Sequence, residues 1–326
     1  MATPALANTQ VLGVSDLSVA YSSHGVAVAA VDHVDLTVME GEVHGLVGES
    51  GSGKSSIASA ILGVLPPTAS VSGAISFSGH ALLRLSDKER REIRGGLLSF
   101  IPQNPMTSLN PVLSIGYQLI ETIRAHSRVS NAEATRRAIE GLRQVGVPDP
   151  NRALKRYPHE FSGGTGQRIL IAAALVHSPH LVVADEPTSA LDATVQRQIV
   201  DLLAGLVKTR RMAMLLISHD MGVIASLSDH VAVMYAGHIV EAGAADEMLS
   251  RPRHPYTSAL LAAARGEARG VRSSEVDPRL LSTCRFLPRC PAAIEACRGE
   301  MPELLKVADG HSARCYLADN PPHSSL

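Results

Sequence analysis

The sequence predicts an α/β protein built on a mainly parallel sheet, with a helical insert and a small C-terminal module that holds four cysteines. Short apolar, strand-like runs alternate with helical patterns along most of the chain. A glycine-rich loop near residue 50 joins one such strand to a helix. All four cysteines lie between Cys284 and Cys315. Together these three observations favour one large domain followed by a smaller appendage.

Composition supports this division and excludes several classes of protein. The chain has 326 residues, and 45% of them are hydrophobic, which is enough for a sizeable core and excludes wholesale disorder. The formal net charge is −1 and aromatic residues make up 3%, so we expect no nucleic-acid partner.

No segment of the sequence predicts a membrane-spanning helix. The longest stretch without a charged residue, from Ser55 to Leu83, contains Pro66, Pro67 and several glycines. The first ten residues lack the basic region of a secretory signal, so we expect a chain that stays in the cytosol.

The elements before residue 111 follow from local patterns. We expect residues 1–16 to form a loose tail. Ser86 and Glu89 have the spacing of a capping box, which predicts a helix that ends at Gly95-Gly96. Alternating or continuous apolar runs predict four strands, and a helix near 53–65 is stopped by Pro66; the strands are 34–38, 43–47, 73–79 and 97–101.

Residues 112–161 change to a helical pattern. Ser130 and Glu133 form a second candidate capping box, and Ala138, Leu142 and Val145 share one helical face before Gly146. Strands return at 181–184, 212–218 and 231–235. Residues 266–283 are polar without a clear period, which predicts a linker before the cysteines.

The strongest motif lies between the strand at 43–47 and the following helix. It fits G-x-x-x-x-G-K-[ST], whose glycines let backbone N–H groups surround phosphates while the helix N-terminus adds its positive end. Lys54 would reach the β- and γ-phosphates and Ser55 would ligate Mg²⁺. The motif residues are Gly48, Glu49, Ser50, Gly51, Ser52, Gly53, Lys54 and Ser55, followed by Ser56.

A second motif brings two carboxylates to the end of a strand. Leu181–Ala184 is apolar, and Asp185 and Glu186 follow it, roughly 130 residues after Lys54. Asp185 would hold Mg²⁺, directly or through water. Glu186 would orient or deprotonate the attacking water.

A third motif opens a helix with Ser162, Gly163 and Gly164. Such a helix start is a second anion-binding end in the same chain. Because the first loop already covers the phosphates from one side, this end predicts that two molecules share each ATP.

The ordered set of motifs resembles the ATP-binding subunits of ABC transporters, over nearly the whole chain. The resemblance implies an ABC ATPase domain with a RecA-like sheet, an antiparallel β region and a helical insert. It also implies that Tyr21 stacks on adenine, Gln103 is the Q-loop glutamine and Mg²⁺ ligand, Asp192 belongs to the D-loop, and His219 is the switch histidine. Gln103, Glu186 and His219 would be the catalytic residues.

Three further segments narrow the resemblance to oligopeptide and dipeptide importers, more to their D-type than to their F-type subunit. These segments are residues 103–111, 157–161 and 254–257. The resemblance implies that residues 1–250 form the nucleotide-binding domain and residues 251–326 a C-terminal extension. It implies a second ATPase subunit (F-type or a copy of this chain), two permease subunits, and indirectly an extracytoplasmic peptide-binding protein. The subunit would sit peripherally on the cytoplasmic face of the membrane.

The resemblance also implies that Ser162, Gly163 and Gly164 are the signature of the family, and one departure from the subfamily directly follows them. Thr165-Gly166 stands where larger residues are usual, and glycine in a first helical turn costs about 0.5–1 kcal/mol relative to alanine. We therefore expect a functional but loosened signature end, which an arginine at position 166 would tighten. The alternative is that Gly166 disables this site and leaves hydrolysis to the site of the partner.

The four cysteines have the spacing Cys284-x5-Cys290-x6-Cys297-x17-Cys315, which lacks the C-x2-C pairs of common zinc sites. Four thiolates suit a [4Fe–4S] cluster, and related peptide-importer subunits carry one at this spacing. Zinc and four reduced structural cysteines are the alternatives.

The motifs and the resemblance together predict an ATPase that energises peptide import. Two alternatives remain open: an ATPase of a nickel or glutathione importer, and an ABC-type ATPase that acts on a macromolecule. Proteins of the latter kind usually carry two ATPase units or a long coiled coil, and this sequence predicts neither.

Overall fold

The computed structural model describes residues 9–23, 26–189, 191–267 and 282–318. They form two compact units, each assembled from separate segments. The first contains Val38–Glu42 and Ser76–Leu215 together with the described residues up to Leu12. The second contains Gly13–Thr37, Val43–Ile75 and the described residues from Leu216 onward.

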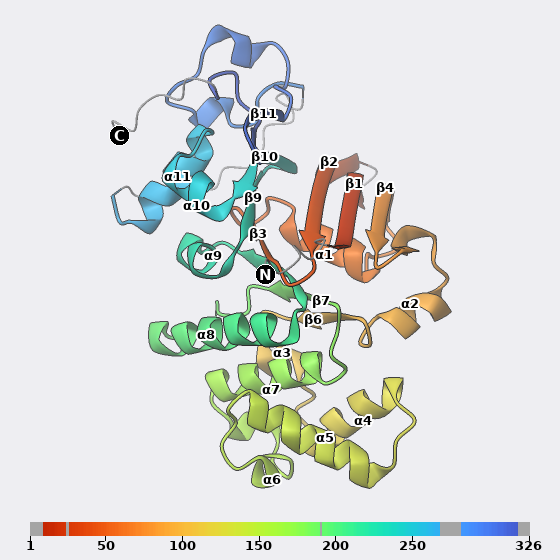
Figure 1. Ribbon diagram of the computed structural model, residues 1–326. Coiled ribbons are helices and arrows are strands. Elements are labelled where there is room, and N and C mark those ends of the chain that lie inside the picture. Colours follow the sequence, from red (N-terminus) through yellow and green to blue (C-terminus); the bar gives the residue numbers. More distant parts are fainter. Residues whose placement is uncertain (1–8, 24–25, 190, 268–281, 319–326) are drawn as a thin grey trace, which may run out of the picture. The chain divides into compact units, whose positions relative to one another are not determined.

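A four-stranded sheet near the N-terminus is built from three longer strands and the short strand β5. Its order is β2-β1-β4-β5, with β1 at Gln10–Ser23, β2 at Val26–Met39, β4 at Ala69–Phe77 and β5 at His80–Ala81 (Figure 1). Residues such as Leu12, Leu17 and Val34 are fully buried. The expected loose tail is wrong from Gln10 onward, and the strand expected at 34–38 is only the end of β2.

The first unit holds the helical insert. The helices α4, α5 and α7 pack on one another, and β6 pairs in parallel with β7, from Leu98 opposite Leu181 to Ile101 opposite Ala184. The mainly helical character expected of this region is confirmed. The bounds are α2 Asp87–Ile93, β6 Leu98–Ile101, α3 Pro105–Ser108, α4 Ile115–His126, α5 Asn131–Gln144, α6 Pro150–Ala153, α7 Gly163–Leu175, β7 Leu181–Asp185 and α8 Ala193–Arg210, with short 3-10 turns at Leu82–Arg84 and Pro158–Glu160.

The helix starts of this unit are set by local polar side chains. The capping box is confirmed at Ser86, whose hydroxyl accepts from the Glu89 N–H while the Glu89 carboxylate accepts from the Ser86 N–H. At Ser130 only half of the predicted box forms, because the Glu133 carboxylate binds Arg136 and Arg137 instead. Those arginines hold the pKa of Glu133 at about 2.

The second unit is built around a ribbon of strands in the order β11-β12-β10-β9-β3. The β3–β9 pair is parallel, and the β9–β10, β10–β12 and β11–β12 pairs are antiparallel. The strand β8 at Ala213–Ser218 runs from the first unit into this one. The other bounds are β3 Val43–Val47, α1 Lys54–Leu62, α9 Met221–Leu227, β9 His230–Tyr235, β10 His238–Ala244, α10 Ala245–Ser250, α11 Pro255–Ala264, β11 Leu305–Ala308 and β12 His311–Ala313, with 3-10 turns at Leu287–Arg289 and Glu295–Arg298.

The residues after 281 therefore extend this ribbon, since β12 pairs with β10 at Glu241 opposite Ala313. Most of the linker expected at 266–283 lies outside the described residues. The fully buried carboxylate of Glu241 connects β10 with residues 253–254 and with β12. It accepts from the Arg253 and His254 N–H groups at 2.7 and 2.9 Å and hydrogen-bonds His311 Nε2 at 2.7 Å.

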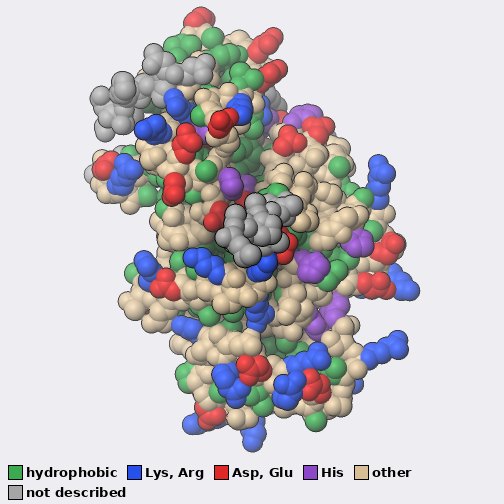
Figure 2. Space-filling view, in the orientation of Figure 1, with side chains coloured by type: hydrophobic (Ala, Val, Ile, Leu, Met, Phe, Trp, Pro, Cys, Tyr) green, Lys and Arg blue, Asp and Glu red, His purple; other side chains and the backbone are tan. Residues whose placement is uncertain are grey.

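None of the helices in the described ranges is both long and apolar enough to cross a membrane. On the face shown in Figure 2, acidic and basic side chains are interspersed over the described residues, without a broad field of one sign. This agrees with the net charge of −1.

Candidate active site

The phosphate-loop motif sits where the sequence predicts it, between the buried strand β3 and the helix α1. Gly51 and Gly53 have positive φ angles of 80° and 111°. A Cβ atom on Gly53 would lie 2.2 Å from the Ala30 carbonyl oxygen, and one on Gly48 would lie 2.1 Å from the Met234 carbonyl oxygen. The loop therefore needs glycine for both its turn and its close packing.

Lys54 is folded back onto its own loop. Its Nζ donates to the carbonyl oxygens of Gly48 and Glu49 at 2.7 and 2.8 Å, and to Ser52 Oγ at 3.3 Å. The residue is only 5% exposed. A cation held by neutral carbonyls is ready to exchange them for anionic oxygens, because charge-assisted hydrogen bonds are the stronger ones.

Two other predicted residues belong to the second unit. The Tyr21 hydroxyl in β1 donates to Ser56 Oγ at 3.1 Å, so this aromatic ring is anchored to the start of α1. His219 follows directly after β8 and is exposed.

The carboxylate pair lies in the first unit at the end of β7. Asp185 is the last residue of the strand, and Glu186 adopts a left-handed conformation with φ of 47°. The Glu186 carboxylate accepts a hydrogen bond from Gln103 Nε2 at 2.9 Å. The predicted base and the predicted Q-loop glutamine are thus brought together, across 83 residues of sequence.

The signature residues open α7 as expected. Ser162 is the N-cap, and its hydroxyl accepts from the Thr165 N–H at 3.4 Å. Gly164 has no room for a side chain, since a Cβ atom there would lie 2.5 Å from Val195 Cγ1 in α8. Asp192 caps α8, where its carboxylate accepts from the Thr194 and Val195 N–H groups at 3.1 and 3.0 Å.

Gly166 has a packing role that its sequence context does not indicate. The residue is buried, and a Cβ atom there would lie 3.2 Å from Pro105 Cβ in α3. Glycine thus lets the first turn of α7 pack against the segment that follows Gln103.

Glu49 has partners that sequence reasoning missed. Its carboxylate oxygens accept from the Arg289 guanidinium at 2.7 and 3.0 Å, and its N–H donates to the Tyr256 hydroxyl at 2.9 Å. These contacts span more than 200 residues of sequence. No local pattern signals such contacts.

All four cysteines are free thiols, and they line one small cavity of the second unit together with His254 and Phe286. Burial raises the pKa of the Cys284 and Cys290 thiols and raises that of Cys315 to about 11. Within the described ranges, no three His, Cys, Asp or Glu side chains are arranged to hold a metal ion. The iron–sulfur assignment therefore stays a prediction.

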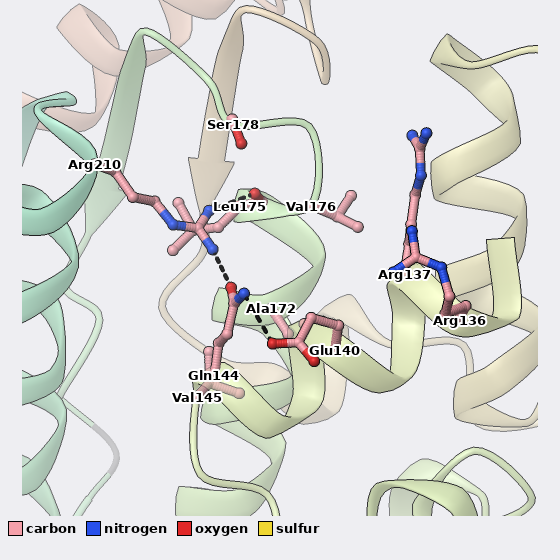
Figure 3. A pocket seen from close by; sticks show the side chains of 11 residues that line it. Arg136, Arg137, Glu140, Gln144, Val145, Ala172, Leu175, Val176, Ser178 and Arg210 are labelled. Atoms are coloured by element: carbon pink, nitrogen blue, oxygen red, sulfur yellow. Dashed lines mark hydrogen bonds between the residues drawn. The ribbon is translucent and has the colours of Figure 1, made fainter. Parts of the chain in front are cut away.

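A larger cavity, of about 220 Å³, lies among α5, α7 and the end of α8, away from every predicted site residue of the first unit. Figure 3 shows Arg210, Gln144 and Glu140 turned toward one another, whereas Arg136 and Arg137 lie apart from them. Arg210 donates to Gln144 Oε1 and, at 2.7 Å, to the Leu175 carbonyl oxygen, and Gln144 Nε2 donates to Glu140 at 3.2 Å. These groups are satisfied by each other, so the cavity carries no chemistry of its own.

Comparisons with known proteins agree with the motifs. Residues 31–189 match the ABC transporter family, and residues 240–297 match the C-terminal region of oligopeptide/dipeptide transporters. The chain is 44% identical over 318 residues to a probable peptide ABC transporter ATP-binding protein of Sinorhizobium fredii, covering 94% of this chain and 95% of the relative. It is 43% identical over 313 residues to the dipeptide transport ATP-binding protein DppD of Escherichia coli, covering 94% and 96% of the two chains.

A third relative is the oligopeptide transport ATP-binding protein OppD of Bacillus subtilis, 41% identical over 319 residues, covering 95% of this chain and 89% of the relative. Among solved structures, a dimeric bacterial ABC transporter cassette matches with a TM-score of 0.65 and 26% identity, covering 72% of this chain and 98% of the cassette. With its phosphate loop, its strand-end carboxylates and these relatives, the chain belongs to the ABC transporter ATP-binding family, among the dipeptide and oligopeptide transport ATP-binding proteins.

Proposed function

We propose that this chain is the ATP-hydrolysing subunit of a transporter that imports dipeptides or oligopeptides. The phosphate loop carries this proposal, because it combines the glycine geometry, the sequestered Lys54 and the strand-to-helix context of an ATP site. Relatives of more than 40% identity along most of their length are dipeptide and oligopeptide transport proteins by name, which supports the substrate class.

The phosphate loop and its surroundings bind the nucleotide. Residues 48–56 surround the phosphates, and Lys54 exchanges its carbonyl partners for the β- and γ-phosphate oxygens. Tyr21, anchored by Ser56, presents its ring to the adenine. Ser55 of the second unit, and Asp185 and Gln103 of the first, are the residues that would hold Mg²⁺. The ion would neutralise charge that develops on the phosphates.

Glu186 is the general base of hydrolysis. Its carboxylate accepts a proton from, or orients, the attacking water, while the Gln103 amide fixes the position of the carboxylate. His219 is the switch histidine beside the γ-phosphate.

The signature helix serves a second ATPase subunit. Ser162, Gly163 and Gly164 present the first N–H groups of α7 to the ATP of the facing subunit, and Asp192 lies at the adjoining D-loop. That subunit is a copy of this chain or an F-type homologue. Two permease subunits and, indirectly, an extracytoplasmic peptide-binding protein complete the assembly, with this chain peripheral on the cytoplasmic face.

The C-terminal residues 251–326 form an extension to the nucleotide-binding domain of residues 1–250. The proposal of a [4Fe–4S] cluster here is supported by donor type alone, since four free thiols line one cavity. Such a cluster would stabilise the fold of the C-terminal extension by cross-linking its four cysteines. Protein purified without oxygen is expected to contain about four iron atoms and four labile sulfides per chain. Zinc or no metal in that preparation would refute the cluster.

The function is tested with the chain assembled with its permease in liposomes. Lys54→Ala is expected to abolish tight ATP binding. Glu186→Gln is expected to keep binding but slow hydrolysis by about 10²–10⁴-fold. Peptide uptake that requires ATP, and is lost in both variants, supports the proposal. ATP-driven uptake of nickel or glutathione without peptide uptake would overturn the substrate class.

A further inference from the structure

The C-terminal extension reaches the phosphate loop through two arginines, each adjacent to a cysteine. Arg289 precedes Cys290, and Arg285 follows Cys284. Both side chains are largely buried, with exposed fractions of 12% and 4%. All of the contacts that follow lie within the second unit.

Arg289 forms a two-pronged ion pair with Glu49 of the phosphate loop. Its NH2 and NH1 groups donate to the two carboxylate oxygens at 2.7 and 3.0 Å. The guanidinium also lies over the rings of Tyr235 and Phe286, at 5.5 and 5.7 Å from their centroids. A planar guanidinium held in this way fixes the position of the carboxylate and places a positive charge beside it.

The backbone of Glu49 is held at the same time. Its N–H donates to the hydroxyl of the fully buried Tyr256 at 2.9 Å, and its carbonyl oxygen accepts from Lys54 Nζ at 2.8 Å. Glu49 therefore links the extension directly to the lysine that must reach the nucleotide phosphates.

Arg285 holds the turn between β9 and β10, which itself contacts the phosphate loop. It donates to the Ala236 carbonyl oxygen and to Asp32 Oδ2, the latter at 2.6 Å. The next residue after Ala236, Gly237, donates its N–H to the Ser52 carbonyl oxygen at 2.9 Å. The turn between β9 and β10 is thus fixed by the extension on one side and contacts the phosphate loop on the other.

We propose that Arg289 is a positioning residue for nucleotide binding: it holds and neutralises Glu49, so that the folded C-terminal extension sets the affinity of the phosphate loop for ATP. This inference rests on the proposed function, because it requires ATP at residues 48–56. Without Arg289, an uncompensated carboxylate remains in a loop that must bind a polyanion. That carboxylate would repel the triphosphate and compete with it for Lys54.

The test measures the dissociation constant of a fluorescent, non-hydrolysable ATP analogue with Mg²⁺ for the full chain. Arg289→Ala is expected to weaken binding about tenfold. Adding Glu49→Gln to this variant removes the unpaired charge and is expected to restore affinity to within about threefold of Glu49→Gln alone. Arg289→Lys keeps the positive charge but loses the pair of parallel hydrogen bonds to Glu49. Its affinity for the analogue is expected to lie between those of wild type and Arg289→Ala.

Arg298→Ala is the matched control. Arg298 also neighbours a cysteine, Cys297, but it is 68% exposed and its ion pair is with Glu295 at 3.6 Å, away from the phosphate loop. Its loss is expected to leave affinity unchanged. Affinity within twofold of wild type in Arg289→Ala would overturn the inference. A double variant as weak as Arg289→Ala would overturn it too, because the arginine would then act only through folding.

Lys54→Ala distinguishes a failure of the proposed ATPase function from a failure of the positioning role of Arg289. If Lys54→Ala binds the analogue as well as wild type, the proposed function fails. If Lys54→Ala loses binding while Arg289→Ala keeps it, only the positioning role fails. Should Arg289→Ala not fold, Arg289→Gln, which is also uncharged, provides the same comparison with and without Glu49→Gln.

Discussion

Gly166 gives the sharpest steric prediction of the structure. Alanine is favoured over glycine by about 1 kcal/mol in a helix interior and by about 0.5–1 kcal/mol in the first turn, where Gly166 lies. At Gly166 the added Cβ atom would lie 3.2 and 3.4 Å from Pro105 Cβ and Cγ, so Pro105 must shift by a few tenths of an ångström. Overpacking of this kind costs about 1–3 kcal/mol. We therefore expect Gly166→Ala to leave the free energy of unfolding unchanged or to lower it by up to about 2 kcal/mol.

Gly205 in α8 provides the control, because it is exposed and a Cβ atom there would meet nothing within 4 Å. Gly205→Ala is expected to raise the melting temperature by about 2–4 °C, the shift that about 1 kcal/mol gives. Thermal unfolding of both variants measures the difference. An equal gain at the two positions would show that Pro105 yields freely and would refute the packing argument.

Gly166→Arg extends the same test to function. The expectation that arginine tightens the signature end was based on helix propensity and on the residue type usual in the subfamily. The buried contact with Pro105 now predicts the opposite result, a lower melting temperature and a lower ATPase rate in the assembled transporter. A rate above wild type would restore the first interpretation.

Two further predictions concern buried or capping side chains. Burial lowers the pKa of His254 to about 4, below the ordinary value of 6.5. Below pH 6.5 the unfolded chain therefore binds more protons than the folded chain. As the pH is lowered from 6.5 to 4, the free energy of unfolding should decrease by up to about 3 kcal/mol. His254→Asn, which keeps an acceptor for the Tyr256 N–H, should flatten this dependence in urea titrations; an unaltered pH profile would contradict the assignment. Asp192→Ala should lower stability by about 1 kcal/mol through loss of the α8 cap, whereas Asp192→Asn should not. A loss of ATPase in Asp192→Asn at full stability would instead show a direct role at the nucleotide.

What the sequence predicted well are features set by local chemistry. The capping box at Ser86, the buried strand β3 and the glycines of the phosphate loop depend on neighbours within a few residues. The start of β1 was missed because its polar residues, Ser15 and Asp16, interrupt the apolar alternation.

The features that escaped prediction depend on distant partners. Glu49 is one of the unspecified positions of its motif, and its arginine lies 240 residues away. Glu241 gives no sign in the sequence that it is fully buried, because its three partners come from residues 253, 254 and 311. Contacts between residues this far apart in sequence form only when the chain has folded, so no local sequence pattern indicates them.

The pairing of β12 with β10 has a consequence for anyone who shortens this chain. A truncated protein that stops at residue 250 would lack β12 and leave β10 as an edge strand with unpaired N–H and C=O groups. That edge carries Ile239 and Val240, both buried in the full chain, and the Glu241 carboxylate would lose its partners from residues 253, 254 and 311. Such an edge is a template for strand addition between molecules. Self-association of the shortened protein would therefore reflect an opened sheet rather than the dimerisation of an ATPase.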